Sequence, residues 1–137
     1  MNTEGRIIGV DYGTKRVGLA LADPLCISIS PIGTFDPSRA VEELRRFNQR
    51  DPISTIVVGW PLLLDGSEGD QTKRVQEYVN RIRNAFPNVD VLKWDERYTS
   101  EMARAAVAEY RQQRRGGREP GLDAVAACII LQDYLER

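Results

Sequence analysis

The chain has 137 residues, with 19 basic side chains, 20 acidic side chains and no histidine. Because the net charge is close to zero, overall charge does not predict nucleic-acid binding, and the distribution of charge must do so instead. The absence of histidine excludes Ser–His–Asp and Cys–His catalysis, so acid–base chemistry falls to carboxylates, lysine or tyrosine. Cys26 and Cys128 lie far apart in apolar segments, which argues against a zinc site or a disulfide framework.

The length fits one domain, residues 1–137, with a full sheet-and-helix core. The chain begins with polar residues, unlike a secretory signal, and its longest apolar run, Ile53 to Leu64, is interrupted by Gly59 and Pro61. No run is long enough to span a bilayer. We therefore expect a cytoplasmic protein that makes no use of a membrane, and the cysteine usage fits a reducing compartment.

The first part of the chain predicts three strands and a helix. Arg6 to Asp11 and Arg16 to Ala22 are apolar runs joined by a short link, so we expect an antiparallel hairpin. Ile27 to Phe35 is the third strand. Asp36-Pro37 is typical of a helix N-cap followed by proline in the first turn. Apolar residues then recur at helical spacing as far as Asp51-Pro52.

The middle of the chain predicts a strand, a loop, a helix and a strand. Ser54 to Gly59 is apolar and β-branched, which indicates a buried, parallel strand. Leu64 to Gly69 is a polar loop that either closes over a substrate or is simply mobile. An apolar stripe from Val75 to Phe86 predicts a helix, and Val89 to Trp94 predicts the last strand.

The final part predicts two helices separated by a polar loop. Thr99 or Ser100 caps the first helix, Arg111 to Pro120 forms an Arg-rich loop, and the second helix begins near Gly121. The resulting order is β-β-β-α-β-α-β-α-α. It predicts an α/β fold with a mixed five-stranded sheet, three antiparallel strands followed by two parallel ones, and helices on both faces. In such sheets, sites form at the carboxyl ends of the parallel strands.

Acidic residues end two predicted strands and begin the last helix. Asp11 ends the first strand, where a buried carboxylate is costly unless something pairs with it. Asp95 and Glu96 end the last strand, and only one of them shares a given face. Asp123 heads the apolar stripe of the last helix. If the first and last strands lie close together, these carboxylates meet.

Each of these acids also has an ordinary interpretation. Asp11 could be a turn residue, Glu96 could pair with Arg97 or cap a helix, and Asp123 could compensate a helix dipole. Clustered carboxylates, however, repel one another, and a cation is their natural stabiliser. Oxygen-only ligands suit Mg²⁺ or Mn²⁺. Metal-assisted attack on a phosphodiester needs no histidine, so the hypothesis fits this composition.

Basic residues flank the predicted site. They are candidates for contact with a phosphate backbone, although a charge run is usually solvated surface. The candidates are Lys15, Arg16, Arg97, Arg111, Arg114, Arg115 and Arg118.

Four blocks of the sequence resemble the YqgF/RuvX family of Holliday-junction-resolvase-like nucleases. The blocks are Gly9 to Ala20, Val58 to Pro61 with Asp65 to Ser67, Asp95 to Ser100, and Leu122 to Leu131. The third block usually ends in Thr-Thr, and Ser100 departs from that pattern. The resemblance covers essentially the whole chain. It implies a ribonuclease H fold and a role in processing the 5′ end of precursor 16S rRNA, or in resolving branched DNA.

Carried over residue by residue, the resemblance implies that Asp11, Glu96 and Asp123 are catalytic. The same three residues, with Asp95, become the ligands of Mg²⁺ or Mn²⁺. The implied partner is nucleic acid, either precursor rRNA or branched DNA. Because a junction resolvase needs a twofold dimer, a homodimer is a further expectation.

Two other classes of function stay open. Asp11-Tyr12-Gly13-Thr14 is similar to the phosphate loop of actin-like and sugar-kinase-like ATP-binding domains, although the chain is short for two lobes and no second such block is found. A non-catalytic nucleic-acid-binding module is the other alternative. Resolvases of this fold normally end the fourth strand with a carboxylate, where this chain has Gly59-Trp60-Pro61.

Overall fold

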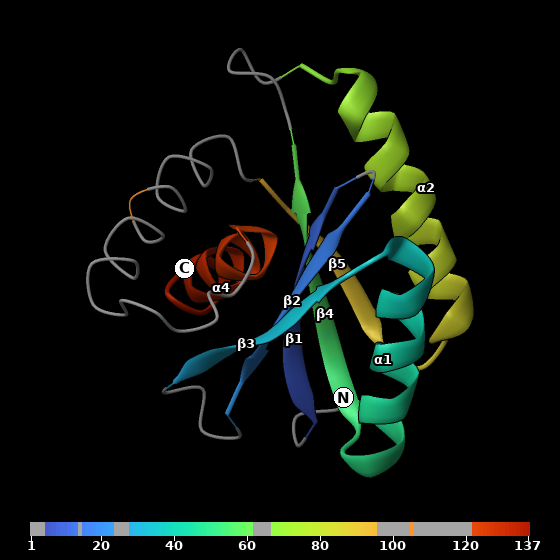
Figure 1. Ribbon diagram of the computed structural model, residues 1–137, viewed down its shortest axis with the longest axis vertical. Coiled ribbons are helices and arrows are strands. Elements are labelled where there is room, and N and C mark those ends of the chain that lie inside the picture. Colours follow the sequence, from blue (N-terminus) through green and yellow to red (C-terminus); the bar gives the residue numbers. More distant parts are fainter. Residues whose placement is uncertain (1–4, 14, 24–27, 62–66, 96–104, 106–121) are drawn as a thin grey trace.

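The structure is a computed structural model that describes residues 5–13, 15–23, 28–61, 67–95, 105 and 122–137 (Figure 1). The strands are β1 (Arg6–Tyr12), β2 (Val17–Ala22), β3 (Ile29–Phe35), β4 (Ile53–Trp60) and β5 (Asp90–Asp95). The helices are α1 (Pro37–Arg50), α2 (Asp70–Ala85) and α4 (Leu122–Leu135). All of them lie where the sequence predicts a strand or a helix. The predicted helix after Thr99 or Ser100 and the Arg-rich loop lie outside the described residues, except that Ala105 is helical.

The five strands form one mixed sheet in the order β3-β2-β1-β4-β5. β2 pairs antiparallel with β1 and β3, and β4 pairs parallel with β1 and β5, which confirms the predicted arrangement. β1 is central, and β4 separates it from β5. The carboxyl ends of β1 and β5 are therefore two strand spacings apart, about 10 Å, rather than adjacent.

Helices cover both faces of the sheet, as predicted (Figure 1). On one face, Ile8 and Val10 of β1 pack in a core with residues of α1 and α2 such as Leu44 and Val79. On the other face, Ala20 and Val57 pack against α4. We call these the α1/α2 face and the α4 face. Alternation along each strand assigns every side chain of the sheet to one of them.

Local sequence explains how α1 begins. The side chain of Asp36 accepts a hydrogen bond of 2.9 Å from the backbone N–H of Arg39, and Pro37 occupies the first helical position. This hydrogen bond confirms the prediction that Asp36 is the N-cap of the helix and that proline follows it. The hydroxyl of Tyr78 in α2 donates to the carbonyl of Pro37 over 2.8 Å, so the start of α1 is also tied to its neighbouring helix.

α4 is apolar along most of its length. Ala127 and Leu131 pack against the sheet, whereas Ala126 and Ile129 belong to a separate buried cluster. From Ala124 to Leu131 the helix is therefore buried on two sides, which is typical of the interior of a protein, and Gln132 and Asp133 near its end are exposed. Among the described helices, none has both the length and the apolarity needed to cross a membrane.

Candidate active site

Asp11 lies at the end of β1 on the α4 face. Its neighbours Val10 and Tyr12 belong to the core of the α1/α2 face or pack against it, so alternation directs Asp11 to the opposite side. The residue is partly buried. It stands at the carboxyl end of a central strand that pairs in parallel with β4, which is where open α/β sheets place their sites.

Asp123 reaches the same place from the first turn of α4. The Cα partner of Asp11 on β2 is Gly18. A Cβ atom added to Gly18 would lie 2.0 Å from the carbonyl oxygen of Asp123, so only glycine allows the helix to approach the strand this closely. The backbone of Asp123 therefore lies over the strand position beside Asp11, although the two residues are near opposite ends of the chain.

Glycines surround Asp11 on the α4 face. Gly9 precedes it on the same face of β1, where an added Cβ would lie 2.7 Å from the carbonyl oxygen of Ala127. Gly18 lies beside it on β2. On β4, Val58 pairs with Val10, so the next residue, Gly59, continues the register opposite Asp11. The missing side chains at Gly9 and Gly18 thus let the backbone of α4 pack directly on the strands beside Asp11.

Asp95 ends β5 on the opposite face of the sheet. Its Cα partner is Trp60, which packs against the core of the α1/α2 face, whereas the preceding Trp94 packs on the α4 side. The sheet therefore stands between Asp95 and Asp11. Glu96, the next residue, lies outside the described residues.

The donor chemistry of Asp11 and Asp123 fits a hard divalent cation. Both residues offer carboxylate oxygens, the ligands that Mg²⁺ and Mn²⁺ prefer in proteins. Within the described ranges no three potential ligands group together, so a third carboxylate would have to come from elsewhere in the chain.

Two of the predicted basic residues lie at the same end of the sheet. Lys15 and Arg16 are exposed at the tip of the β1–β2 hairpin. The backbone N–H of Gly13 donates to the Arg16 carbonyl over 2.8 Å and closes the turn just past Asp11. The remaining predicted cations fall outside the described residues; they are Arg97, Arg111, Arg114, Arg115 and Arg118.

The end of β1 is held from the other face by a pair of tyrosines. The rings of Tyr12 and Tyr78 stack with their centroids 4.6 Å apart. Burial raises the pKa of the Tyr78 hydroxyl above its ordinary value, and the hydroxyl donates to Pro37. Tyr78 therefore stays protonated near neutral pH, and its position suits support of the strand rather than proton transfer.

Sequence reasoning missed two residues level with Asp11 on the neighbouring strands β2 and β3. One is Gly18, although a glycine inside an apolar strand is a known sign of close backbone approach. The other is Thr34 of β3, whose Cα partner is Gly18, so that Asp11, Gly18 and Thr34 lie side by side on three neighbouring strands. The Thr34 hydroxyl is buried and makes no hydrogen bond within the described part of the chain. No sequence signal distinguishes that threonine from others in strands.

The fold defines the class of protein. The structure of T. thermophilus RuvC in complex with a Holliday junction substrate matches with a TM-score of 0.60 and 14% sequence identity. The match covers 96% of this chain and 95% of the RuvC chain. At that identity the likeness establishes the fold, and the chain has the ribonuclease H-like fold of RuvC, as predicted.

Sequence comparison defines the family. The model of the RuvX family, described as Holliday junction resolvase, matches residues 5–137. A relative from Salinibacter ruber is 44% identical over 100% of this chain and 96% of its own length. A relative from Chlorobium luteolum is 44% identical over 99% of this chain and 97% of its own length. Both are named "Putative pre-16S rRNA nuclease". The chain therefore belongs to the RuvX family, which confirms the resemblance of the four sequence blocks.

Proposed function

We propose that this protein is a divalent-metal-dependent nuclease that hydrolyses phosphodiester bonds in structured nucleic acid, with precursor 16S rRNA as its substrate. One observation supports the site above all others: the close contact of α4 with Gly18 brings the backbone of Asp123 beside the position of Asp11. Family membership and the names of the relatives support the reaction and the substrate class.

In this proposal Asp11, Asp123 and Glu96 hold Mg²⁺ or Mn²⁺. The alternation of β5 supports Glu96 over Asp95 as the third ligand, because Asp95 is directed to the α1/α2 face. When bound, the ion supplies Lewis-acid stabilisation of phosphate oxygens and lowers the pKa of the attacking water. The carboxylates fix the position of that charge, and Asp11 is central because β1 lies between β2 and β4.

Other groups of the chain position the substrate. Gly9 and Gly18 let the start of α4 approach the strands beside Asp11, so a phosphodiester would reach the carboxylates from the carboxyl end of β1. Lys15 and Arg16 are exposed at the hairpin tip and can bind phosphates on one side of it. In the proposal the predicted cations outside the described residues bind the backbone as well; they are Arg97, Arg111, Arg114, Arg115 and Arg118.

Cleavage of branched DNA is a second candidate function. It is supported by the description of the RuvX family and by the RuvC-like fold. A resolvase needs two active sites related by twofold symmetry, so this candidate requires a homodimer, whereas rRNA processing does not. In either case we propose that residues 1–137 act as one nuclease domain in the cytoplasm.

The substitution Asp11→Asn tests the proposal. The purified protein is assayed with Mn²⁺ on precursor-rRNA fragments and on four-way DNA junctions, beside the control Asp51→Asn at the other end of the sheet. We expect Asp11→Asn to lower the cleavage rate by more than about 100-fold, because it removes a metal ligand rather than a supporting group. Full activity in Asp11→Asn would contradict the assignment. Binding without cleavage in the wild type would favour the non-catalytic module, and tight ATP binding in calorimetry would favour the ATPase-like alternative.

A further inference from the structure

One flank of α1 has a row of arginines that the proposed active site does not use. Arg39, Arg46 and Arg50 recur with Glu43 at spacings of four, three and four residues, so all four lie on one side of the helix. That side differs from the buried stripe that includes Ala40 and Leu44. The arginines are well exposed, with 58% of the Arg39 side chain and 69% of the Arg46 side chain accessible to solvent.

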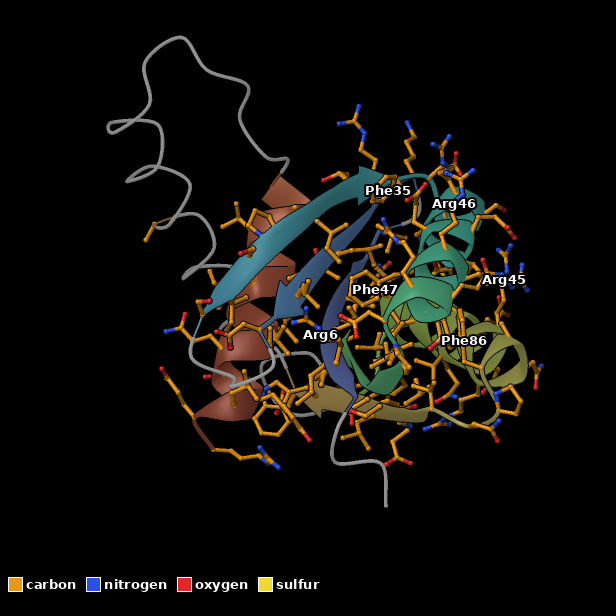
Figure 2. The ribbon with its side chains drawn as sticks, turned by 90° about the horizontal axis from the view of Figure 1, so that it is seen from below. Arg6, Phe35, Arg45, Arg46, Phe47 and Phe86 are labelled. Carbon is orange, nitrogen blue, oxygen red and sulfur yellow. The ribbon has the colours of Figure 1, made fainter. Side chains whose placement is uncertain are left out.

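Figure 2 shows that the row is on the flank of α1 nearest to β3. Arg46 extends on the side of Phe35, at the end of β3, whereas the adjacent Arg45 extends on the other side of the helix. Arg45 pairs with Glu42, which also belongs to that other flank. The two sides of the helix therefore differ, and only one of them faces the β2–β3 edge of the sheet.

The row continues to the tip of the β1–β2 hairpin. Arg16 directly precedes Val17, which pairs with Phe35, and Phe35 directly precedes the N-cap Asp36. The hairpin tip and the first turn of α1 therefore lie side by side at the same end of the sheet as Asp11. We call the set Lys15, Arg16, Arg39, Arg46 and Arg50 the basic stripe. It begins at the rim of the candidate site and runs away from it along α1.

The carboxylates beside the stripe do not neutralise it. Glu43 accepts a hydrogen bond of 3.2 Å from the guanidinium of Arg39 and lies 3.5 Å from that of Arg46, so one carboxylate serves two arginines. Asp36 is committed to capping α1. Five cations against two carboxylates leave an excess of positive charge in a chain whose net charge is −1. Exposed ion pairs also contribute little to stability, so folding alone does not explain the arrangement.

We propose that the basic stripe binds the phosphate backbone of the nucleic-acid arm that leads away from the cleaved bond. The inference rests on the proposed nuclease function and extends it to the substrate. From Arg39 to Arg50 the helix rises about 16 Å, which matches the axial length of about five nucleotides of one strand. Guanidinium groups bind phosphates through paired hydrogen bonds, and exposed arginines on one helix flank can follow a backbone without reading its sequence.

Salt-dependent binding tests the proposal. The probes are a precursor-rRNA stem and a four-way DNA junction with arms of about 20 base pairs, titrated in EDTA so that metal-dependent cleavage is suppressed. The test variant combines Arg39→Gln, Arg46→Gln and Arg50→Gln. The matched control combines Arg45→Gln, Lys73→Gln and Arg74→Gln, which removes the same charge from exposed positions outside the stripe. Melting temperatures of both variants establish that they are folded.

We expect the stripe variant to lower the slope of log affinity against log salt by about 2 to 3, and to weaken binding about tenfold or more. The control is expected to change the slope by less than about 1. A precursor-rRNA probe that ends at the cleaved bond should abolish the difference, because no backbone would then extend along the stripe. Two variants with equal slopes would overturn the proposal and leave an acidic protein as the partner of this flank.

A cleavage assay with Mn²⁺ on the same probes separates this inference from the nuclease proposal. If cleavage with Mn²⁺ is intact but the stripe variant binds like the control, the stripe proposal fails and the nuclease proposal stands. If binding depends on the stripe but no cleavage occurs with any metal, the nuclease proposal fails and the stripe remains a binding surface. Failure of the wild type to bind either probe would overturn both.

Discussion

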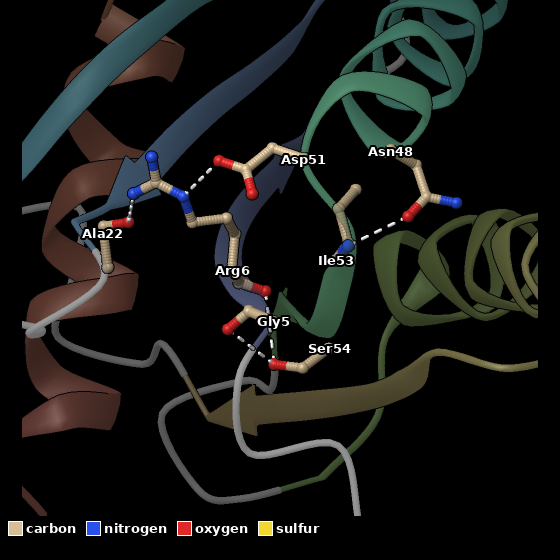
Figure 3. A network of polar contacts seen from close by, with 7 residues as sticks. All are labelled: Gly5, Arg6, Ala22, Asn48, Asp51, Ile53 and Ser54. Carbon is tan, nitrogen blue, oxygen red and sulfur yellow. Dashed lines mark hydrogen bonds and ion pairs between the residues drawn. The ribbon is translucent and has the colours of Figure 1, made fainter.

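The two ends of β1 are built in different ways. At the amino end, the guanidinium of Arg6 lies 2.6 Å from the carboxylate of Asp51 and donates to the carbonyl of Ala22 over 3.3 Å (Figure 3). Close by, the backbone N–H of Ile53 donates to the side chain of Asn48 over 2.9 Å. This end satisfies its charge and its polar groups with partners from the same chain.

The carboxyl end of β1 is built on a close approach of α4 to the sheet. The backbone of Asp123 lies beside the position of Asp11. Gly18, which has no side chain, allows α4 to pack this closely against β2. Carboxylates that share a site repel one another unless a cation compensates them. One strand thus has an end suited to stability and an end suited to binding, and substitutions at the two ends should have separable effects.

The largest expected effect is on catalysis at the carboxyl end. Asp123→Asn should lower the rate of metal-dependent cleavage by more than about 100-fold, because it removes a proposed ligand. It should leave the melting temperature in EDTA nearly unchanged, because the contact with Gly18 is made by the backbone of Asp123.

Asp133→Asn on the same helix is the control for that substitution. The Asp133 carboxylate lies ten residues after Asp123, near the other end of α4, and accepts a hydrogen bond of 3.2 Å from the indole N–H of Trp94. Its loss should affect stability slightly and activity not at all. Equal losses of activity in the two variants would show that charge on α4, rather than a ligand at its start, is what matters.

The next largest effect is expected from adding a side chain where β2 and α4 are in close contact. In Gly18→Ala the new Cβ would lie 2.0 Å from the carbonyl of Asp123, so the start of α4 must move. We expect a loss of about 1–3 kcal/mol of folding free energy from overpacking, measured by urea unfolding, with a large loss of cleavage.

Gly5→Ala provides the matched change at the amino end. There an added Cβ would lie 2.6 Å from the backbone nitrogen of Ser54. This variant should also lose stability, but the protein that remains folded should cleave at the wild-type rate. If Gly18→Ala retained full activity, the packing of α4 on Gly18 would not be needed to form the site.

A smaller effect is expected at the charged pair of the amino end. Arg6→Gln removes the ion pair with Asp51, whose side chain is 43% exposed. Solvent screens such a pair, so we expect a loss of about 0.5–1 kcal/mol in urea unfolding. The cleavage rate should not change. A loss of activity without a loss of stability would show that the two ends are not independent.

The smallest effect is expected at Thr34. Its buried hydroxyl has no hydrogen-bond partner among the described residues, so Thr34→Val replaces it with a methyl group of similar size. Stability should stay the same or rise by up to about 1 kcal/mol. Thr34→Ser, which keeps the hydroxyl, is the comparison. If Thr34→Val loses more than about 1 kcal/mol while Thr34→Ser does not, the hydroxyl has a partner after all.

Local sequence was sufficient for most of the fold. The hairpin of β1 and β2, the Asp36 cap of α1 and the β-branched run of β4 depend on neighbouring residues, and each was predicted where it is found. The mixed sheet also followed from short and long connections between strands. The family blocks then narrowed the class, and the family and fold comparisons agree with them.

The arrangement of the candidate site depended on contacts that local sequence does not encode. Nothing near Gly18 indicates that the start of α4 packs on it. The insertion of β4 between β1 and β5 determines how far apart their ends lie, and it follows from the order of the sheet. Alternation did predict that only one of Asp95 and Glu96 shares the face of Asp11, but the register with Trp60 was needed to assign Asp95 to the opposite face.

Calorimetric titration with Mn²⁺ tests the central claim most directly, because it measures metal binding at Asp11 without a substrate. The account predicts that the wild-type protein binds Mn²⁺ and that Asp11→Asn abolishes this binding. Asp51→Asn, which removes a carboxylate from the amino end, should bind Mn²⁺ like the wild type. Unchanged Mn²⁺ binding by Asp11→Asn, or an equal loss in both variants, would contradict the account.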